Sequence, residues 1–174
     1  DKLYWYENPK AEGLAKGLKW KQHLLSVGRG QNEAYFLRDM DGDGTPEIVV
    51  DCCIDDAPMV MWRFAKQKEE GKPKLERIEI GPEGNGHGMA FGDVNGDGRE
   101  DILCKSGWYE RPAGDIFAGR WKLHRDWTLT HGSCPFIVTD LTGDGKNDLI
   151  WGFGHEFGLF WYEQLEPSDG KTKW

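Results

Sequence analysis

Short apolar runs, some alternating with polar residues and some continuous, recur along the chain between turns rich in Gly, Asp and Asn. Runs of four to eight residues bounded by such turns predict β-strands, and none shows the 3.6-residue period of a substantial helix. The expected strands lie near residues 3–7, 20–26, 34–38, 47–53, 59–65, 75–80, 88–92, 101–105, 107–110, 121–126, 135–139, 148–152 and 158–163, with a further strand beginning at Trp174.

One acidic motif, Asp-x-Asp/Asn/Thr-Gly-Asp-Gly-x-x-Asp/Glu, occurs three times and divides these strands into similar units. Its copies begin at Asp39, Asp93 and Asp140, so they are separated by 54 and 47 residues. Self-similarity at this period is typical of solenoids and propellers. Four short antiparallel strands in roughly 40–50 residues predict an all-β fold, a β-propeller made of four-stranded blades.

Each motif also has the composition of a calcium loop, because Ca²⁺ takes about six to eight oxygen ligands from carboxylates, carbonyls and water. The seventh position would contribute a backbone carbonyl, and the ninth would close the coordination sphere. The candidate ligands are Asp39, Asp41, Asp43, Thr45 and Glu47 in the first loop, Asp93, Asn95, Asp97, Arg99 and Asp101 in the second, and Asp140, Thr142, Asp144, Lys146 and Asp148 in the third. The alternative is three Gly-rich hairpin turns with acidic tips.

The loops differ from EF-hands, which carry a bidentate Glu at the twelfth position and continue into a helix. Here the twelfth positions hold Val50, Cys104 and Trp151, and each loop runs into a short apolar strand. We therefore expect up to three Ca²⁺ ions at junctions between strands, where their role is structural. The neutral hydroxyl of Thr142 should make the third site the weakest.

Tryptophan and histidine recur in register outside the loops. Trp-Tyr-Glu occurs at Trp5, Trp108 and Trp161, with Trp62-Arg63-Phe64 in the remaining unit. Repeated strand tryptophans indicate packing between blades, although exposed rings could instead stack on sugars. When segments are aligned by their distance from the loops, Trp20 takes the same position as Trp121, and His23 and Arg77 take the same position as His124. A structural role is therefore expected for the two histidines.

The three loops, with segments such as GHGMAFGDVNGDGREDIL and GHEFGLFWYEQ, resemble FG-GAP/VCBS repeats, the calcium-binding blades also found in integrin alpha-subunit propellers, and resemble secreted bacterial proteins of this class. The third loop's Thr142 and the vicinal Cys52 and Cys53 depart from that pattern. The resemblance implies a propeller of about seven blades.

The whole chain is interpreted as one propeller region, with units at 1–30, 31–84, 85–130 and 131–174, the first and last incomplete. About 3.5 blades cannot close a ring of four to eight. We therefore expect either a fragment of a larger propeller or a half-ring completed by a second chain.

The charge composition argues against nucleic acid as a partner. The 174 residues carry a net charge of −8, and the absence of a basic stripe argues against nucleic-acid binding. Three bound Ca²⁺ ions, adding six positive charges, would reduce the charge from −8 to −2.

No apolar run reaches the roughly 20 residues of a membrane span. Calcium at extracellular concentrations suits such loops, so a secreted or periplasmic location is expected. Four cysteines allow three pairings or buried free thiols.

A second polar cluster is expected at the opposite end of the strands, where the second and third strands of each unit connect and the first strand begins. Its candidate catalytic residues are His87, His131 and His155. Neighbouring polar residues there are Glu33, Asp55, Asp56, Cys134 and Glu156. The histidines could be turn residues bonded to backbone, ligands of a transition metal, or a general base with a partner acid.

Two functional classes follow. The first is a calcium-stabilised binding module that presents a polar surface to a glycan or protein ligand. The second is a carbohydrate-active enzyme on the same scaffold, since the resemblance extends to propellers in polysaccharide lyases and a sugar dehydratase. The sequence contains no nucleophile elbow and no Gly-rich phosphate loop.

Overall fold

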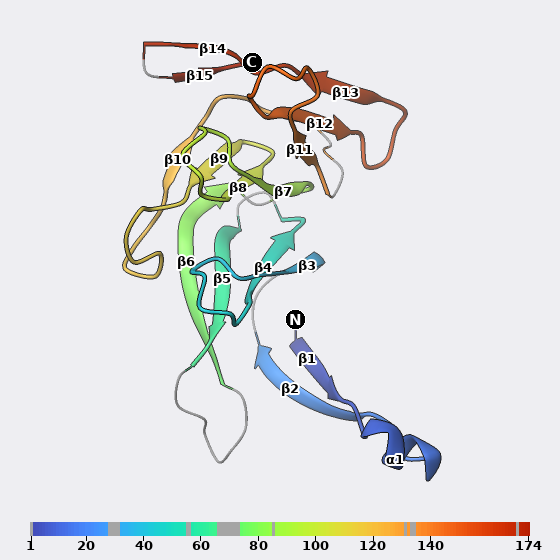
Figure 1. Cartoon of the computed structure of the whole chain (residues 1–174). Helices are drawn as coiled ribbons and strands as arrows, with labels where there is room; N and C mark the ends of the chain where they lie inside the picture. The colour runs from blue at the N-terminus through green and yellow to red at the C-terminus, as the bar shows by residue number, and fades with distance from the viewer. Residues whose placement is uncertain are drawn as a thin grey trace.

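The computed structural model describes residues 2–27, 32–54, 57–65, 74–84, 86–130, 132, 135–169 and 171–174. The fold is all-β and consists of several small antiparallel sheets (Figure 1). The strands are β1 (Lys2–Glu7), β2 (Lys21–Val27), β3 (Asn32–Arg38), β4 (Glu47–Cys52), β5 (Pro58–Phe64), β6 (Leu75–Gly84), β7 (Met89–Gly92), β8 (Asp101–Cys104), β9 (Gly107–Glu110), β10 (Lys122–His124), β11 (Ile137–Thr139), β12 (Asp148–Gly152), β13 (Leu159–Tyr162), β14 (Leu165–Ser168) and β15 (Lys171–Lys173).

Consecutive strands pair with one another, so each sheet is a simple meander. The first sheet has the order β3-β4-β5-β6, the second β10-β9-β8-β7 and the third β11-β12-β13. β1 pairs with β2, and β14 pairs with β15, in separate two-stranded sheets. A four-stranded antiparallel meander is the architecture of a propeller blade, and the arrangement is consistent with part of a propeller.

The β1–β2 hairpin and the β9–β10 pair have the same internal chemistry. Trp5 lies opposite His23 and their rings stack with centroids 4.3 Å apart, while Trp108 and His124 stack at 4.0 Å. In each pair the histidine Nε2 also contacts a glutamate carboxylate, of Glu7 at 2.9 Å and of Glu110 at 2.7 Å. The expected structural role of these histidines is thus seen directly, and the hydrogen bond from His124 lowers the pKa of Glu110.

The first sheet corrects the alignment made by counting residues. Met61, not Trp62, lies opposite Val49, the place that Trp108 takes opposite Leu103 in the second sheet. Opposite Met61 on the fourth strand is Ile78, so the counted match between Arg77 and the two histidines is one residue out of register. Because side chains alternate between faces, a shift of one residue exchanges the buried and exposed faces of a strand.

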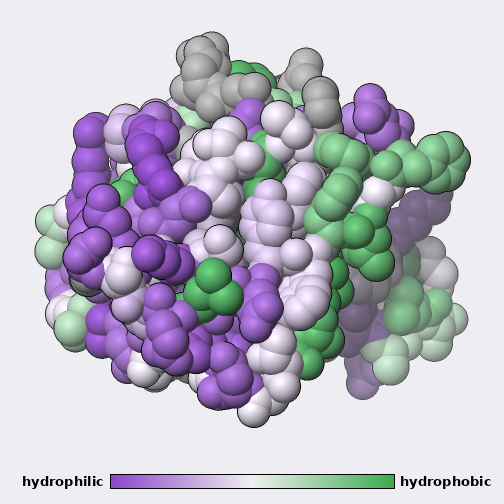
Figure 2. Space-filling view, turned by 90° about the horizontal axis from the view of Figure 1, so that it is seen from above, coloured by the Kyte–Doolittle hydropathy of each residue, from purple (hydrophilic) through white to green (hydrophobic). Residues whose placement is uncertain are grey.

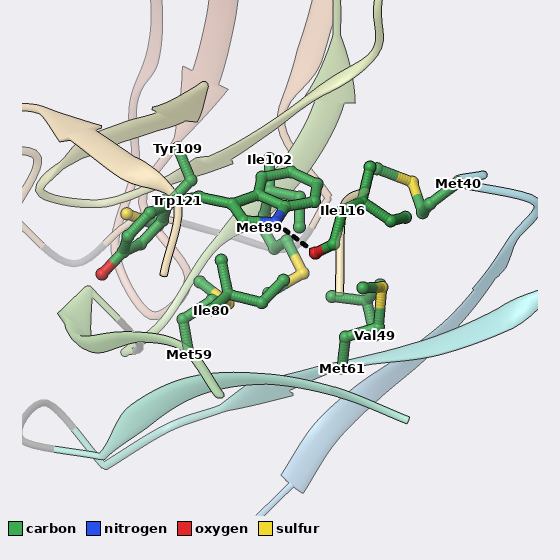
Figure 3. Packing of buried hydrophobic residues seen from close by; sticks show 11 residues of the cluster. Met40, Val49, Met59, Met61, Ile80, Met89, Ile102, Tyr109, Ile116 and Trp121 are labelled. Carbon is green, nitrogen blue, oxygen red and sulfur yellow. Dashed lines mark hydrogen bonds between the residues drawn. The ribbon is translucent and has the colours of Figure 1, made fainter. Parts of the chain in front are cut away.

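Two apolar clusters hold the three larger sheets together. In the first cluster, Met59 and Met61 of β5 and Ile80 of β6 pack against Met89 and Ile102 of the second sheet (Figure 3). The Trp121 indole N–H donates to the Ile116 carbonyl at 3.0 Å in the same cluster. The second cluster joins the other face of the second sheet to the third sheet, and its members include Ala90, Leu103, Trp108, Phe136, Leu149 and Trp151.

Whether a tryptophan is buried depends more on the elements packed against it than on its position in the repeat. Trp108 and Trp121 are buried as expected, but Trp20 and Trp161 are 52% and 47% exposed. Other large apolar side chains are exposed as well, and Figure 2 shows hydrophobic residues gathered toward one side of the view from above. Trp151, on β12, is a core residue.

Two local elements differ from expectation. A short helix, α1 (Lys10–Ala15), lies in the connection between β1 and β2. No strand begins at Trp174; the chain forms the β14–β15 hairpin, and the Trp174 ring packs edge-on against Trp127 at 4.9 Å. The thiol of Cys104 is free and buried, while Cys134 lies outside the described residues. No helix in the described ranges is long and apolar enough to cross a membrane.

The packing between sheets predicts a contrast between two leucines. Leu103 is fully buried between the second and third sheets, whereas Leu159 on β13 is 80% exposed. Leu103→Ala should lower the free energy of unfolding by about 2–5 kcal/mol, because it removes apolar contacts and leaves a cavity. Leu159→Ala, the matched control, should change it by less than about 0.5 kcal/mol. Urea unfolding followed by tryptophan fluorescence measures both; equal effects would contradict the packing described.

Candidate functional site

The three acidic motifs form the turns that join the first and second strands of each larger sheet. They are loop 1 (residues 39–47), loop 2 (93–101) and loop 3 (140–148). The motif glycines adopt positive φ angles, for example 78° at Gly42 and 86° at Gly44, a conformation that side chains with a Cβ rarely adopt. The glycines therefore allow a tight curl in which successive acidic side chains point inward.

The first aspartate of each loop organises the curl. In loop 1, the Asp39 carboxylate accepts hydrogen bonds from the backbone N–H groups of Gly42 at 2.9 Å and Gly44 at 3.0 Å. Asp93 and Asp140 accept the equivalent pairs of bonds in loops 2 and 3. Since these bonds recur in all three loops, the turn geometry follows from the motif.

Loop 1 has the arrangement of a cation site. Carboxylate oxygens of Asp39, Asp41 and Asp43 all lie within 4.8 Å of one another, and the three residues are exposed. The seventh position is Thr45, which brings no positive charge. A hard divalent cation such as Ca²⁺ fits this donor set, because it is composed of oxygens that repel one another until a cation binds.

Loops 2 and 3 place a basic side chain where loop 1 has Thr45. Arg99 donates a hydrogen bond to the carboxylate of Asp97 within loop 2. In loop 3, Lys146 Nζ lies 2.8 Å from Asp144 Oδ2, and this hydrogen bond lowers the pKa of Asp144. Within the described residues only loop 1 forms a group of three acidic side chains that could hold a metal ion. A cation entering loop 2 or 3 would have to displace a basic group from the fifth-position carboxylate.

The ninth position is buried in every loop and faces the backbone. The Asp101 carboxylate accepts from the N–H of Val94 at 2.9 Å and from that of Arg111 at 2.9 Å. Asp148 likewise accepts from the N–H groups of Leu141 and Gln164. Sequence reasoning assigned these carboxylates only to closing the metal sphere; the structure shows that Asp101 and Asp148 also tie loops 2 and 3 to the segment after the third strand.

Contacts between neighbouring sheets tie loop 2 to the third sheet. Asn147 Nδ2 donates to the Asp93 carbonyl at 2.9 Å, and Gln164 Nε2 donates to the Val94 carbonyl at 2.7 Å. These two residues were not identified from the sequence. Asn147 lies within a motif copy, but nothing in the sequence marks Gln164, which contacts a residue 70 positions away.

At the end of the strands opposite the acidic loops, some of the candidate residues of the histidine cluster lie in contact. His87 Nδ1 lies 2.9 Å from the Glu33 carboxylate, and the rings of His87 and His155 meet edge to face at 5.2 Å. The structure thus brings two of the three candidate histidines together with one acid. The other candidates there, His131, Asp55, Asp56 and Cys134, lie outside the described residues.

Comparison with known proteins agrees with the loop chemistry. Residues 39–104 match the model of a family described as an FG-GAP-like repeat. The matched span begins at the first aspartate of loop 1, includes all of loop 2 and ends with β8. The chain therefore contains an FG-GAP-like repeat. Neither the search of curated proteins nor the search of solved structures found a match.

The buried carboxylate of loop 2 predicts a pH dependence. Burial raises the pKa of Asp101 to about 6 from an ordinary 3.8; the charges of Asp97 and Asp93 add to this rise, and the backbone N–H groups oppose it. The folded state then holds the proton more tightly than the unfolded chain. The free energy of unfolding of metal-free protein should therefore fall as the pH rises between about 4 and 6.

Urea unfolding at several pH values, after treatment with a chelating resin, measures this slope. Asp101→Asn cannot titrate and should show a shallower slope over that range, although it is less stable because an amide loses one of the two acceptor oxygens. Asp115→Asn, at an exposed carboxylate, should keep the wild-type slope. Identical slopes in wild type and Asp101→Asn would refute the assignment.

Proposed function

We propose that the protein is a calcium-stabilised, propeller-type binding module that acts outside the cytoplasm and presents its surface to a glycan or protein ligand. The observation that carries the proposal is the cluster of three carboxylates in loop 1, from Asp39, Asp41 and Asp43. The FG-GAP-like repeat over residues 39–104 supports a repeat module of this kind.

Calcium would act on stability in this proposal. Asp39, Asp41, Asp43 and the carbonyl of Thr45 would hold the ion at the junction of β3 and β4. When bound, the ion supplies charge that offsets repulsion between the carboxylates, and the loop's own hydrogen bonds orient them. Loops 2 and 3 would bind more weakly, because Arg99 and Lys146 already neutralise their fifth-position carboxylates.

The secreted or periplasmic location is part of the same proposal. Extracellular modules bind calcium with dissociation constants of about 0.1–1 mM, which suits a loop with three exposed carboxylates. Further blades, from this chain or from a second chain, would cover the open apolar side chains such as Ile137 and Trp161.

Calcium removal gives the direct test. If calcium is present at about 100 times its dissociation constant, binding adds about 2.7 kcal/mol to the free energy of unfolding. Chelation should then lower the melting temperature by about 5–10 °C. Asp43→Asn should abolish the tightest calcium site in isothermal titration calorimetry and most of this thermal shift.

Two further variants serve as comparisons. Asp144→Asn in loop 3 should reduce the shift less, because Lys146 already pairs with that carboxylate. Glu156→Gln, at an exposed position away from the loops, should bind calcium as the wild type does. A melting temperature that stays unchanged after complete removal of calcium would contradict the proposal.

The contact between His87 and His155 favours a second candidate, a lyase or dehydratase acting on acidic carbohydrate. The Glu33 carboxylate beside His87 could hold that ring as a general base, while His155 lies next to it. Proton abstraction beside a carboxylate is the step that such a base would perform on a uronic-acid polysaccharide.

New ultraviolet absorbance from unsaturated products, measured across uronic-acid polysaccharides, distinguishes the candidates. Under the enzyme hypothesis, His87→Ala and His155→Ala should each lower the rate at least about 100-fold while calcium binding and melting temperature stay at wild-type values. Activity that survives in the double variant would exclude a catalytic role for this cluster.

A further inference from the structure

A cleft of about 670 Å³ opens beside loop 1, on the opposite end of the strands from the histidine cluster. It lies between loop 1, the end of β5 and the connection from β9 to β10. Its lining includes Asp41, Asp43, Arg63, Phe64, Arg99 and Arg111. Its volume is within the roughly 300–1,000 Å³ of small-molecule sites.

Arg111 has a feature that distinguishes it from the other basic groups of this cleft. Its backbone is fixed, because its N–H donates to Asp101 at 2.9 Å and its carbonyl accepts from Arg99 Nε at 3.0 Å. Its side-chain Nε, however, is buried and has no hydrogen-bond partner among the described residues. A buried N–H without an acceptor is costly, and a guanidinium in a cleft is suited to bind a carboxylate.

The other two arginines of the cleft already have partners. Arg63 Nε donates to Glu76 at 2.8 Å, and its guanidinium lies 4.3 Å from the centre of the Phe117 ring. Arg99 is paired with Asp97 in loop 2. An incoming anion would therefore find its strongest unmet donor at Arg111, with Arg63 and Arg99 contributing positive charge nearby.

The balance of charge in the cleft depends on loop 1. Without a cation, four lining carboxylates outnumber three guanidinium groups, and the cleft disfavours an anion. One Ca²⁺ in loop 1 would reverse this balance, because it adds two positive charges at the wall formed by Asp41 and Asp43. Calcium in loop 1 is thus expected to strengthen the binding of an anion here.

We propose that this cleft binds a carboxylate-bearing sugar, such as a uronate unit of an acidic polysaccharide, through Arg111, with calcium in loop 1 raising the affinity. The apolar wall at Phe64, which is 36% exposed, provides ring surface for a sugar face beside the charged groups. This assignment depends on the proposed calcium site in loop 1 and moves the ligand site away from the histidine cluster.

Isothermal titration calorimetry of the full chain with digalacturonate, in about 1 mM calcium, tests the assignment. Arg111→Met should weaken digalacturonate binding about tenfold or more, and Arg111→Lys should keep only part of the affinity, because an ammonium group lacks the planar fork that binds a carboxylate through two hydrogen bonds. Arg120→Met is the matched control: Arg120 lies on the same connection, pairs with Glu79 and is 63% exposed. It should bind digalacturonate as the wild type does.

Calcium titrations of the same samples, with their melting temperatures, separate the two proposals. If Arg111→Met keeps wild-type calcium binding and melting temperature but loses digalacturonate, both proposals are supported. Wild-type affinity in Arg111→Met, or an aspartate-rich peptide that binds as tightly as the sugar, would overturn the cleft assignment.

The remaining outcomes are also decisive. Calcium binding without any digalacturonate binding would overturn the cleft assignment and leave the calcium proposal standing. If loop 1 binds no calcium, the calcium proposal fails; sugar binding that still depends on Arg111 would then show a cleft that works without the ion. Absence of both would refute both.

Discussion

The structure depends on a buried carboxylate at the ninth position of each acidic loop. Asp101 and Asp148 each accept two backbone N–H bonds, one from the loop and one from a residue one or two positions after the third strand. Glu47 makes the bond to its own loop, through the N–H of Met40. A buried charge is stable only where it is well bonded, so folding of the loop and pairing of the strands require each other.

This coupling explains how an exposed loop can affect the core. The same loops that gather carboxylates on the surface begin the strands whose next residues are Ile48, Ile102 and Leu149, all of them buried. An ion at the surface would therefore act on elements that reach the packing between sheets. In loops 2 and 3, the basic side chain at the seventh position neutralises part of the negative charge that an ion would otherwise offset.

The sequence predicts the elements in which a motif determines its own geometry. The three turns, the strands after them and a structural role for His23 and His124 could all be expected, because each depends on residues close in the chain or repeated in register; the stacking of these histidines on Trp5 and Trp108 was not predicted. The match of Trp62 to Trp108 failed by one residue, because Trp62 lies opposite Ile48 whereas Trp108 lies opposite Leu103, and a recurring tryptophan does not reveal how its strand pairs.

Other features depend on what lies alongside in space, and the sequence does not contain that information in readable form. Trp108 and Trp161 occupy the same repeat position, yet only Trp108 has a sheet packed over it. Likewise, the cleft joins loop 1 to a connection more than 60 residues away, so Arg111 carries no sequence signal. The same holds for Gln164, whose partner Val94 is 70 positions away.

The side chains of Asn147 and Gln164 bond to the backbone carbonyls of Asp93 and Val94, which crosslinks two neighbouring turns. A mechanical load applied to one turn would consequently be shared by the next before either strand could peel away. Loops 2 and 3 would thus loosen together under load, and not one at a time.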